Sequence, residues 1–456
     1  MPGALMAGEN AVDIASFRRN SHDEVLDNLT KGIAGVLQDA FADSPCRDFF
    51  LWCSSPQSPA QPEWLRLSGS GATHAMTEKV LLYSMEDAHA EHLLGQSSAL
   101  NTYLAFDAVA NDLGIGLGMD PRLDGPHERL RRKLATDVNH AAIRALSRPR
   151  PAAPMLLADS RASARRIDFL IQTPSGAAYS QLVKAFNAQC GRNVRADVRA
   201  ALWPLLVGNI IAARGVLRAI RGLRYAEPVR RYLLGRYTGV NRMIGTGLRG
   251  GIGQRLESSA DAILASTTLG YYIAFLLDTP EYRDVPMEEI DLLLFRALSA
   301  CNRLVCLLSD IGPELLKNQS GREDLANRIT DATAATDSRF DEVLARVCAD
   351  DPMTTRLEKD LTRRQTNLAL DSLHALPVAK AAPAFVKRLN YFAHAYGTAE
   401  RSLIDACQGL RHLTGRSEIS KLVLNFFSFH DSDYANSYNL VAGGYSGVSL
   451  RMVPPA

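Results

Sequence analysis

Long stretches of this chain are rich in alanine and leucine and lack the alternation of apolar and polar residues that is typical of strands. Apolar runs without a period of two indicate helices rather than half-buried strands. We therefore expect an all-α protein. Hydrophobic residues make up 46% of the 456 residues, which is enough to bury a large core.

Charge and cysteine content restrict the classes of function. The formal net charge is only +2, whereas dedicated nucleic-acid-binding proteins usually carry a strong basic excess, so we expect no nucleic-acid partner. No uncharged apolar run reaches the length of about 18 residues that a membrane span needs, so we expect no stable membrane insertion. The N-terminus lacks a charged segment followed by an apolar one. The seven cysteines form no Cys-x-x-Cys pair. Together these features predict a cytoplasmic protein with reduced cysteines.

The polar and Pro-rich segments suggest how the chain is organised. We expect a flexible N-terminus over 1–20, a single helical domain over 21–429 and a tail or lid over 430–456. The Pro-rich segment 148–154 is the best linker candidate, and the region of about 119–225 could be an insertion. Helices are expected at 21–41, 79–94, 98–113, 127–147, 256–278, 287–317, 322–348, 353–374, 382–413 and 416–428, and the segment 176–225 is also expected to be helical.

The most informative stretch is the end of the expected helix 287–317. Gly312-Pro313 should kink or end this helix. Asp310 and Glu314 are four residues apart, which would place both carboxylates on one helical face. With the hydroxyl of Ser309, they could hold a divalent metal. The alternative is an ion pair with Arg296, Arg303 or Lys317.

A second acidic cluster lies near the N-terminal half. Asp87 and Glu91 are also four residues apart, with Glu86 beside them. One or two carboxylates together with substrate phosphate oxygens commonly hold Mg²⁺. The alternative is an exposed acidic helix end.

The segment 214–255 is rich in arginine and is interrupted by glycines, which argues against one continuous helix there. Guanidinium groups bind diphosphates through paired hydrogen bonds. Most of these arginines should be ordinary surface residues. Arg249 and Arg255 are the chosen diphosphate-binding candidates, because they lie nearest the next helix.

Aromatic side chains could line an apolar cavity that stabilises a carbocation. Ordinary core packing is the alternative for the same residues. The candidates are Tyr83, Tyr271, Tyr272, Phe275, Phe295, Tyr391, Phe392 and Tyr396.

Three segments appear in a recognisable order: Thr268-Leu269-Gly270, then Val285-Pro286, then Leu307-Leu308-Ser309-Asp310-Ile311. In this order and spacing, residues 264 to 324 resemble the later half of class I terpene synthases. The chain departs from the family's second metal motif, since Ser309, Pro313 and Lys317 replace its Asn, Ser and Glu. The Arg expected just before Thr268 is also absent.

The rest of the chain resembles the family more loosely. The family's first Asp-Asp-x-x-Asp motif would correspond to Glu86-Asp87-x-x-Ala90-Glu91. Its C-terminal Arg-Tyr pair would correspond to Arg411-His412. The two metal motifs are separated by about 80 residues more than in the family.

The resemblance implies a class I terpenoid-synthase-like helical bundle around a central apolar cavity. The implied activity is that of a sesquiterpene cyclase: Mg²⁺-dependent departure of diphosphate from a prenyl diphosphate, with farnesyl diphosphate as the expected substrate, followed by cyclisation. The implied catalytic residues are Glu86, Asp87, Asp310 and Glu314. Glu91 and Ser309 join them as ligands of two or three Mg²⁺ ions. The implied diphosphate-binding residues are Arg249, Arg255, Lys317 and Arg411, and a homodimer is compatible with this family.

Two other classes fit parts of the sequence. Glu86-x-x-His89 has the spacing of di-iron helical oxidases, and Asp137-x-x-His140 and Asp371-x-x-His374 are similar. A non-enzymatic helical partner-binding protein is the other alternative. It predicts that Asp310 and Glu314 are exposed and paired with lysine or arginine, whereas a cyclase predicts that the two acidic clusters face each other across a cavity mouth.

Overall fold

The computed structural model describes residues 27–40, 47–67, 76–77, 80–81, 83–110, 126–147, 174–191, 198–246, 250–333, 338–349, 351–363, 366–373 and 376–436. Within these ranges every regular element is a helix, and the one β-bridge, between Arg339 and Pro377, is isolated. The predicted all-α class is therefore confirmed. Residues 1–20, Arg249 and 437–456 lie outside the described ranges.

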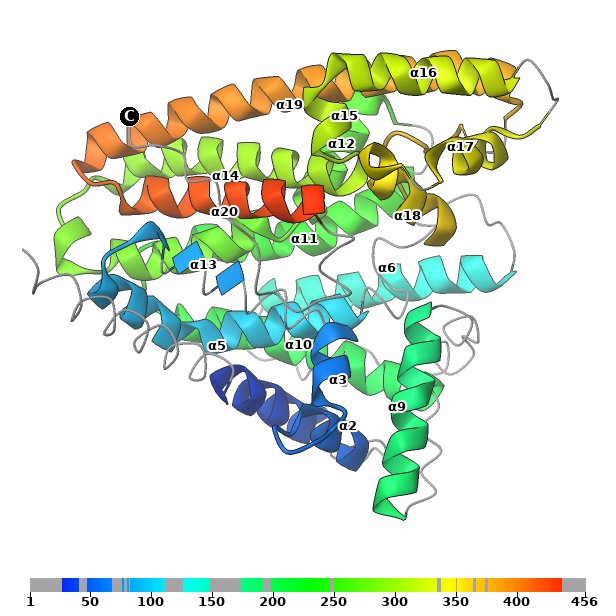
Figure 1. Cartoon of the computed structure of the whole chain (residues 1–456). Coiled ribbons are helices and arrows are strands. Elements are labelled where there is room, and N and C mark those ends of the chain that lie inside the picture. Colours follow the sequence, from blue (N-terminus) through cyan, green and yellow to red (C-terminus); the bar gives the residue numbers. More distant parts are fainter. Residues whose placement is uncertain are drawn as a thin grey trace, which may run out of the picture.

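The chain builds helices of very different lengths (Figure 1). The unlabelled first helix covers 27–40. The others are α2 (Arg47–Ser54), α3 (Gln61–Leu67), α5 (Asp87–Ala110), α6 (Pro126–Ser147), α9 (Pro174–Cys190), α10 (Val198–Ala219), α11 (Ala226–Thr246), α12 (Ile252–Ala262), α13 (Ala265–Leu277), η4 (Pro280–Tyr282), α14 (Met287–Asp310), α15 (Pro313–Lys317), α16 (Gln319–Thr333), α17 (Phe340–Cys348), η5 (Pro352–Thr354), α18 (Thr355–Arg363), α19 (Val378–Thr414) and α20 (Glu418–Asn436).

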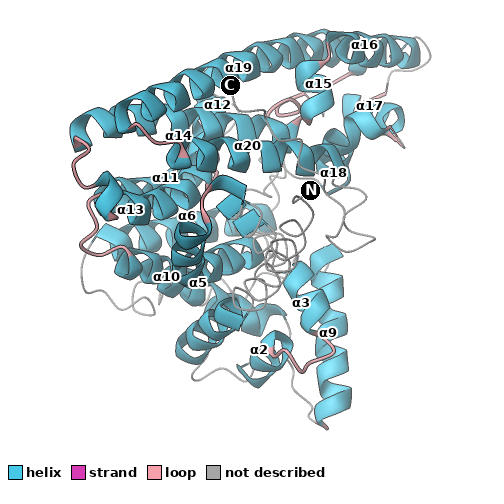
Figure 2. Ribbon diagram, turned by 60° about the vertical axis from the view of Figure 1, so that its left-hand side comes forward, coloured by secondary structure: helices cyan, strands magenta, loops and turns pink. Residues whose placement is uncertain are grey.

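Helix α14 is the centre of the C-terminal half. It packs against α12, α13, α18, α19 and α20, and Figure 2 shows it between α19 and α11. Leu294, Leu298 and Leu308 are fully buried on it, and each such side chain stabilises the fold by about 1.5–3 kcal/mol. Helix α14 is long and apolar enough to cross a membrane, and so is the bent pair α12–α13, but 61% of the apolar window of α14 is buried. Burial of this kind is what the core helix of a bundle shows.

The N-terminal half packs onto the same core. Helix α10 packs against α5, and α6 packs against α11. At the lower end in Figure 1, α2, α3 and α9 meet through aromatic rings, with Phe49 and Phe186 5.6 Å apart between centroids. The region of about 119–225 thus contributes α6, α9 and α10 to contacts with the rest of the chain.

A buried ion pair fixes α5 against α11. Arg236 Nη2 lies 3.1 Å from Asp107 Oδ2, and both side chains are less than one-tenth exposed. Next to it, the hydroxyl of Tyr237 donates to Asn209 Oδ1 on α10 at 2.8 Å. Removing one partner of such a pair would leave an uncompensated buried charge, so the pair fixes the relative position of these helices.

Several expected helix boundaries differ in the structure. Residues 256–278 were expected to be one helix, but α12 and α13 are separated at Ile263–Leu264 and bend by 46°. The segment 79–94 is interrupted at Met85–Glu86, and the next helix continues to Ala110. Helix α20 extends to Asn436, so the beginning of the expected 430–456 lid is helical.

Candidate functional site

Helix α14 ends at Asp310 because of the two residues that were expected to break it. Gly312 adopts φ +91°, a left-handed conformation that glycine tolerates best, and Pro313 then starts α15. This break places Asp310 and Glu314 on different helices. They do not share one helical face, and Glu314 is exposed while Asp310 is only partly accessible.

The carboxyl group of Asp310 is hydrogen-bonded to the turn over residues 366–373. Among the described residues it forms no ion pair. Its Oδ2 accepts a hydrogen bond from the backbone N–H of Leu368 at 2.9 Å. The side-chain amide of Asn367 donates both to the Asp310 carbonyl oxygen, at 2.6 Å, and to Asp360 Oδ2, at 2.7 Å. Burial and the nearby negative charge of Asp360 raise the pKa of Asp310 to about 7. Two carboxylates therefore share a region of low solvent access, which disfavours ionisation of Asp310.

Two cations from α18 accompany these acids. Lys359 Nζ lies 2.9 Å from Asp360 Oδ1, and burial lowers the pKa of this lysine. Arg356 Nε donates to the carbonyl oxygen of Ser309 at 3.0 Å, so the Ser309 backbone is engaged. The Arg356 guanidinium also lies over the ring of Tyr434, 4.5 Å from its centroid. Both cations partly offset the effect of Asp360 on Asp310.

The turn over residues 366–373 connects Asp310 to two further arginines. Arg255 Nη1 lies 3.4 Å from Asp371 Oδ2, and both side chains are almost buried. Arg388 donates to Ser372 Oγ at 2.9 Å and to the carbonyl oxygens of Ala369 and Asp371. Burial and the neighbouring Arg255 lower the pKa of Arg388. We call Arg255, Asp310, Arg356, Lys359, Asp360, Asn367, Asp371 and Arg388 the Asp310 cluster.

Lys317, which was expected to bind diphosphate, forms an ion pair with Asp431. Its Nζ lies 2.6 Å from Asp431 and 5.9 Å from the centroid of Tyr396. The Tyr396 hydroxyl also donates to Asp431, at 3.4 Å. The alternative partner Arg303 instead pairs with Glu257 at 2.9 Å. Neither base thus forms an ion pair with Asp310.

The N-terminal acidic cluster lies at the other end of α14. His89 Nε2 on α5 is 3.8 Å from Glu281 Oε2 in η4, which precedes α14. Asp310 is the last of the 24 residues of α14, a length of about 36 Å at 1.5 Å per residue. Figure 1 shows α5 and α14 both starting from this side. Glu86 and Glu91 are exposed there, so the structure does not bring the two acidic clusters together.

Arg411 is also distant from Asp310. It is exposed in the last turn of α19. A Cβ added at nearby Gly409 would lie 3.0 Å from Leu293, which belongs to the beginning of α14. Of the four expected diphosphate-binding residues, Arg255 and Lys317 therefore lie near Asp310, and Arg249 is outside the described residues.

Most of the expected cavity-lining aromatics pack in the core. Tyr271, Tyr272 and Phe275 are buried on α13, and the Tyr271 hydroxyl donates to the Gln96 carbonyl oxygen at 2.6 Å. Tyr396 is buried as well, and Phe392 is fully buried. By contrast, Tyr83, Tyr391 and Phe295 are exposed by 39%, 40% and 56%. Phe295 lines the groove described below.

The residues suggested for a di-iron site are not gathered in the described part of the chain. Asp137 pairs with Lys133 at 2.6 Å on α6, whereas Asp371 lies in a turn rather than on a helix. Among the described residues, no group of three or more His, Cys, Asp and Glu side chains is placed to hold a metal ion.

Sequence reasoning missed most of the Asp310 cluster. Asp360, Asn367 and Arg388 follow Asp310 by 50 to 78 residues and form no recognisable spacing with it. The segment 353–374 was expected to be one helix, which was wrong: α18 ends at Arg363, and residues 366–373 form a turn. Only the long-range contacts of α14 with α18 and α19 bring the Asp310 cluster together.

No protein-family model, no curated protein and no solved structure matches this chain. The resemblance to class I terpene synthases rests on residues 264 to 324 of the sequence.

Proposed function

We propose that this chain is an Mg²⁺-dependent cyclase that ionises a prenyl diphosphate, with the diphosphate bound at the Asp310 cluster. The observation that carries the proposal is the pair Asp310 and Asp360, two carboxyl groups close to Arg356 and Lys359 where the apolar helix α14 ends. Arg255 and Arg388 are held on the adjoining turn that contains Asp371. The carboxylates suit a metal ion and the cationic side chains suit a polyanion, so the cluster as a whole suits a complex of the two.

The donor set of this cluster fits Mg²⁺. Magnesium is usually held by one or two carboxylates together with phosphate oxygens and water, and Asp310 and Asp360 would provide the two carboxylates. Burial and, after it, repulsion from Asp360 raise the pKa of Asp310, and a divalent cation would stabilise the ionised carboxylate against both. When bound, Mg²⁺ would neutralise charge on the departing diphosphate.

The basic residues of the cluster would bind the diphosphate. Arg255 and Arg388 come from α12 and α19, and each is held by hydrogen bonds or an ion pair to the turn that contains Asp371. Guanidinium groups fixed in this way can donate to diphosphate oxygens without a large loss of side-chain freedom. Lys359 would add a third cation. Glu86, Glu91 and Arg411 are not part of this proposed site.

The test compares acids at the two ends of α14. The variants Asp310→Asn and Asp360→Asn should each lower the release of diphosphate from farnesyl diphosphate by about 100-fold or more, because each removes one negative ligand. The matched control Glu86→Gln should stay within about twofold of the unchanged protein. Circular dichroism should show equal helix content in all variants. Full activity of both aspartate variants, or loss of activity only in Glu86→Gln, would contradict the proposed site.

A further inference from the structure

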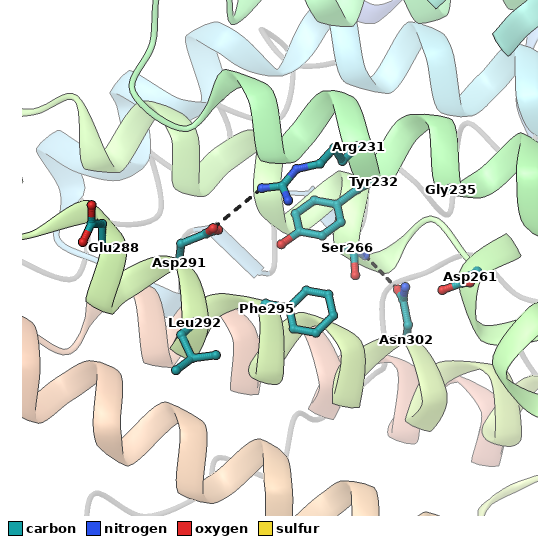
Figure 3. A pocket seen from close by; sticks show the side chains of 10 residues that line it. All are labelled: Arg231, Tyr232, Gly235, Asp261, Ser266, Glu288, Asp291, Leu292, Phe295 and Asn302. Carbon is teal, nitrogen blue, oxygen red and sulfur yellow. Dashed lines mark hydrogen bonds and ion pairs between the residues drawn. The ribbon is translucent and has the colours of Figure 1, made fainter.

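A groove lies between α11 and α14, apart from the Asp310 cluster. Its volume is about 420 Å³ (Figure 3). A neighbouring hollow of about 220 Å³ continues it along α14, and the two share Asp261, Phe295 and Asn302. Small-molecule sites typically measure about 300–1,000 Å³. The groove therefore has the size of a site for a small ligand.

Asn302 provides a buried hydrogen-bond donor inside this groove. Its side chain is only 8% exposed, and its Oδ1 accepts from the backbone N–H of Ser266 at 2.8 Å. A backbone N–H can only donate, so this contact fixes the orientation of the amide and directs Nδ2 elsewhere. Within the described residues Nδ2 has no hydrogen-bond partner in the protein. An acceptor atom of a ligand would supply one.

Three side chains with apolar surface, Phe295, Leu292 and Tyr232, also line the groove. Phe295 and Leu292, one helical turn apart on α14, are 56% and 61% exposed. Tyr232 lies on α11 on the side of the groove opposite Phe295 (Figure 3). Its hydroxyl lies 3.0 Å from that of Tyr225, so its polar group is already engaged and its ring remains for packing. A flat apolar group between these side chains would bury surface that is now in contact with water.

Acidic side chains outnumber basic ones around the groove. The larger hollow is lined by the acids Asp261, Glu288 and Asp291 and the base Arg231, and its continuation adds Glu257, Arg296 and Arg303. Asp291 is 3.6 Å from Arg231, and Asp261 pairs with Arg242. Among the described residues, Glu288 makes no ion pair. The carboxylate of Glu288 therefore favours a cationic ligand at its end of the groove over an anionic one.

We propose that this groove binds a small organic amine that has an aromatic body and one carbonyl group. The carbonyl oxygen accepts from Asn302 Nδ2, the ring packs between Phe295 and Tyr232, and the ammonium group lies beside the acids. Asn302 precedes Asp310 by eight residues on the same helix, or about 12 Å. The inference does not depend on the proposed cyclase activity.

The test uses L-phenylalaninamide as a probe and isothermal titration calorimetry on the full chain. We expect saturable binding with a Kd of about 1 mM, and at least about tenfold weaker binding of N-acetyl-L-phenylalanine, an anion with the same ring and a carbonyl. No saturable binding of the amide would overturn the proposal. Equal binding of the two probes would overturn the assignment of a cationic ligand.

Two pairs of variants locate the binding. A Cβ built at Gly235, which lines the groove, meets no atom within 4 Å. Gly235→Trp should therefore fill the groove and abolish binding, whereas Gly235→Ala should retain it. Phe295→Ser should weaken binding by about tenfold, while Tyr391→Ser, which changes an exposed aromatic on α19, should not. Unchanged binding in Gly235→Trp and Phe295→Ser would show that the probe binds elsewhere and would overturn the proposal.

Discussion

His430 on α20 is surrounded by aromatic rings. Its ring centroid lies 4.6 Å from that of Phe426 and 5.6 Å from those of Phe429 and Tyr434. Its Nδ1 is buried and has no hydrogen-bond partner among the described residues. Burial lowers the pKa of this histidine from 6.5 to about 4. The folded protein therefore keeps the imidazole neutral where an unfolded chain would already be protonated.

This histidine should make the protein sensitive to acid. As the pH falls from 6.5 to about 4, the unfolded state binds a proton that the folded state does not, so the free energy of unfolding falls by about 2–3 kcal/mol. His430→Phe should remove this part of the loss. Urea unfolding at several pH values in this window measures it. The same pH slope in variant and unchanged protein would contradict the assignment.

Asp310 should change the pH dependence of stability in the direction opposite to that of His430. Its pKa rises from 3.8 to about 7 on folding, so its contribution to stability is complete below pH 3.8 and is lost as the pH rises through about 7. Asn resembles the protonated acid. Asp310→Asn should therefore be more stable than the unchanged protein by about 1–2 kcal/mol at pH 8 and nearly equal to it at pH 4.

Urea unfolding in the absence of divalent cations checks this prediction. A variant that is less stable at pH 8 would mean that the fold stabilises the ionised carboxylate of Asp310. The same experiment shows whether loss of activity in Asp310→Asn reflects a changed site or a changed fold.

Just before the break between α12 and α13, the end of α12 packs closely against α11. A Cβ built at Gly239 of α11 would lie 2.8 Å from the backbone nitrogen of Ala262 and 2.9 Å from the carbonyl oxygen of Ser258. Both contacts are with backbone atoms, which cannot move aside as a side chain can. Glycine at this position lets α11 approach the end of α12.

Two glycines on α11 offer a matched comparison. Either change to alanine gains up to about 1 kcal/mol of helix propensity. The Cβ added by Gly235→Ala has no atom within 4 Å. This change should therefore raise the free energy of unfolding by about 0.5–1 kcal/mol. Gly239→Ala should instead lower it by about 2 kcal/mol or more, because α11 and α12 must separate. Thermal or urea unfolding distinguishes them, and equal effects of the two changes would contradict the close approach.

The two helix breaks differ in how far the sequence could predict them. Gly312-Pro313 signals the end of α14 because glycine tolerates φ +91° and proline can start a helix. The break at Ile263–Leu264 has neither residue. It depends on Asn302, which binds the Ser266 amide from a helix 36 residues away. Local patterns cannot show such a contact.

For the molecule as a whole, the apolar runs were enough to predict an all-α protein, because helix period and composition are local properties. The site was predictable only in part. Asp310 could be singled out as an acid at the end of an apolar helix. Its partner Asp360 could not, since it comes from a later helix that folds back onto α14. The expected partners Glu314 and Glu86 are separated from Asp310 by the turn at Gly312 and by the length of α14.

The most direct measurement is turnover by the full chain. Purified protein is incubated with Mg²⁺ and geranyl, farnesyl or geranylgeranyl diphosphate, and volatile products and released diphosphate are quantified. We expect farnesyl diphosphate to yield a cyclic sesquiterpene and an equal amount of diphosphate, with no product when EDTA removes Mg²⁺. If none of the three substrates is consumed, the chain is not a cyclase of this kind, and a helical binding protein becomes the better account.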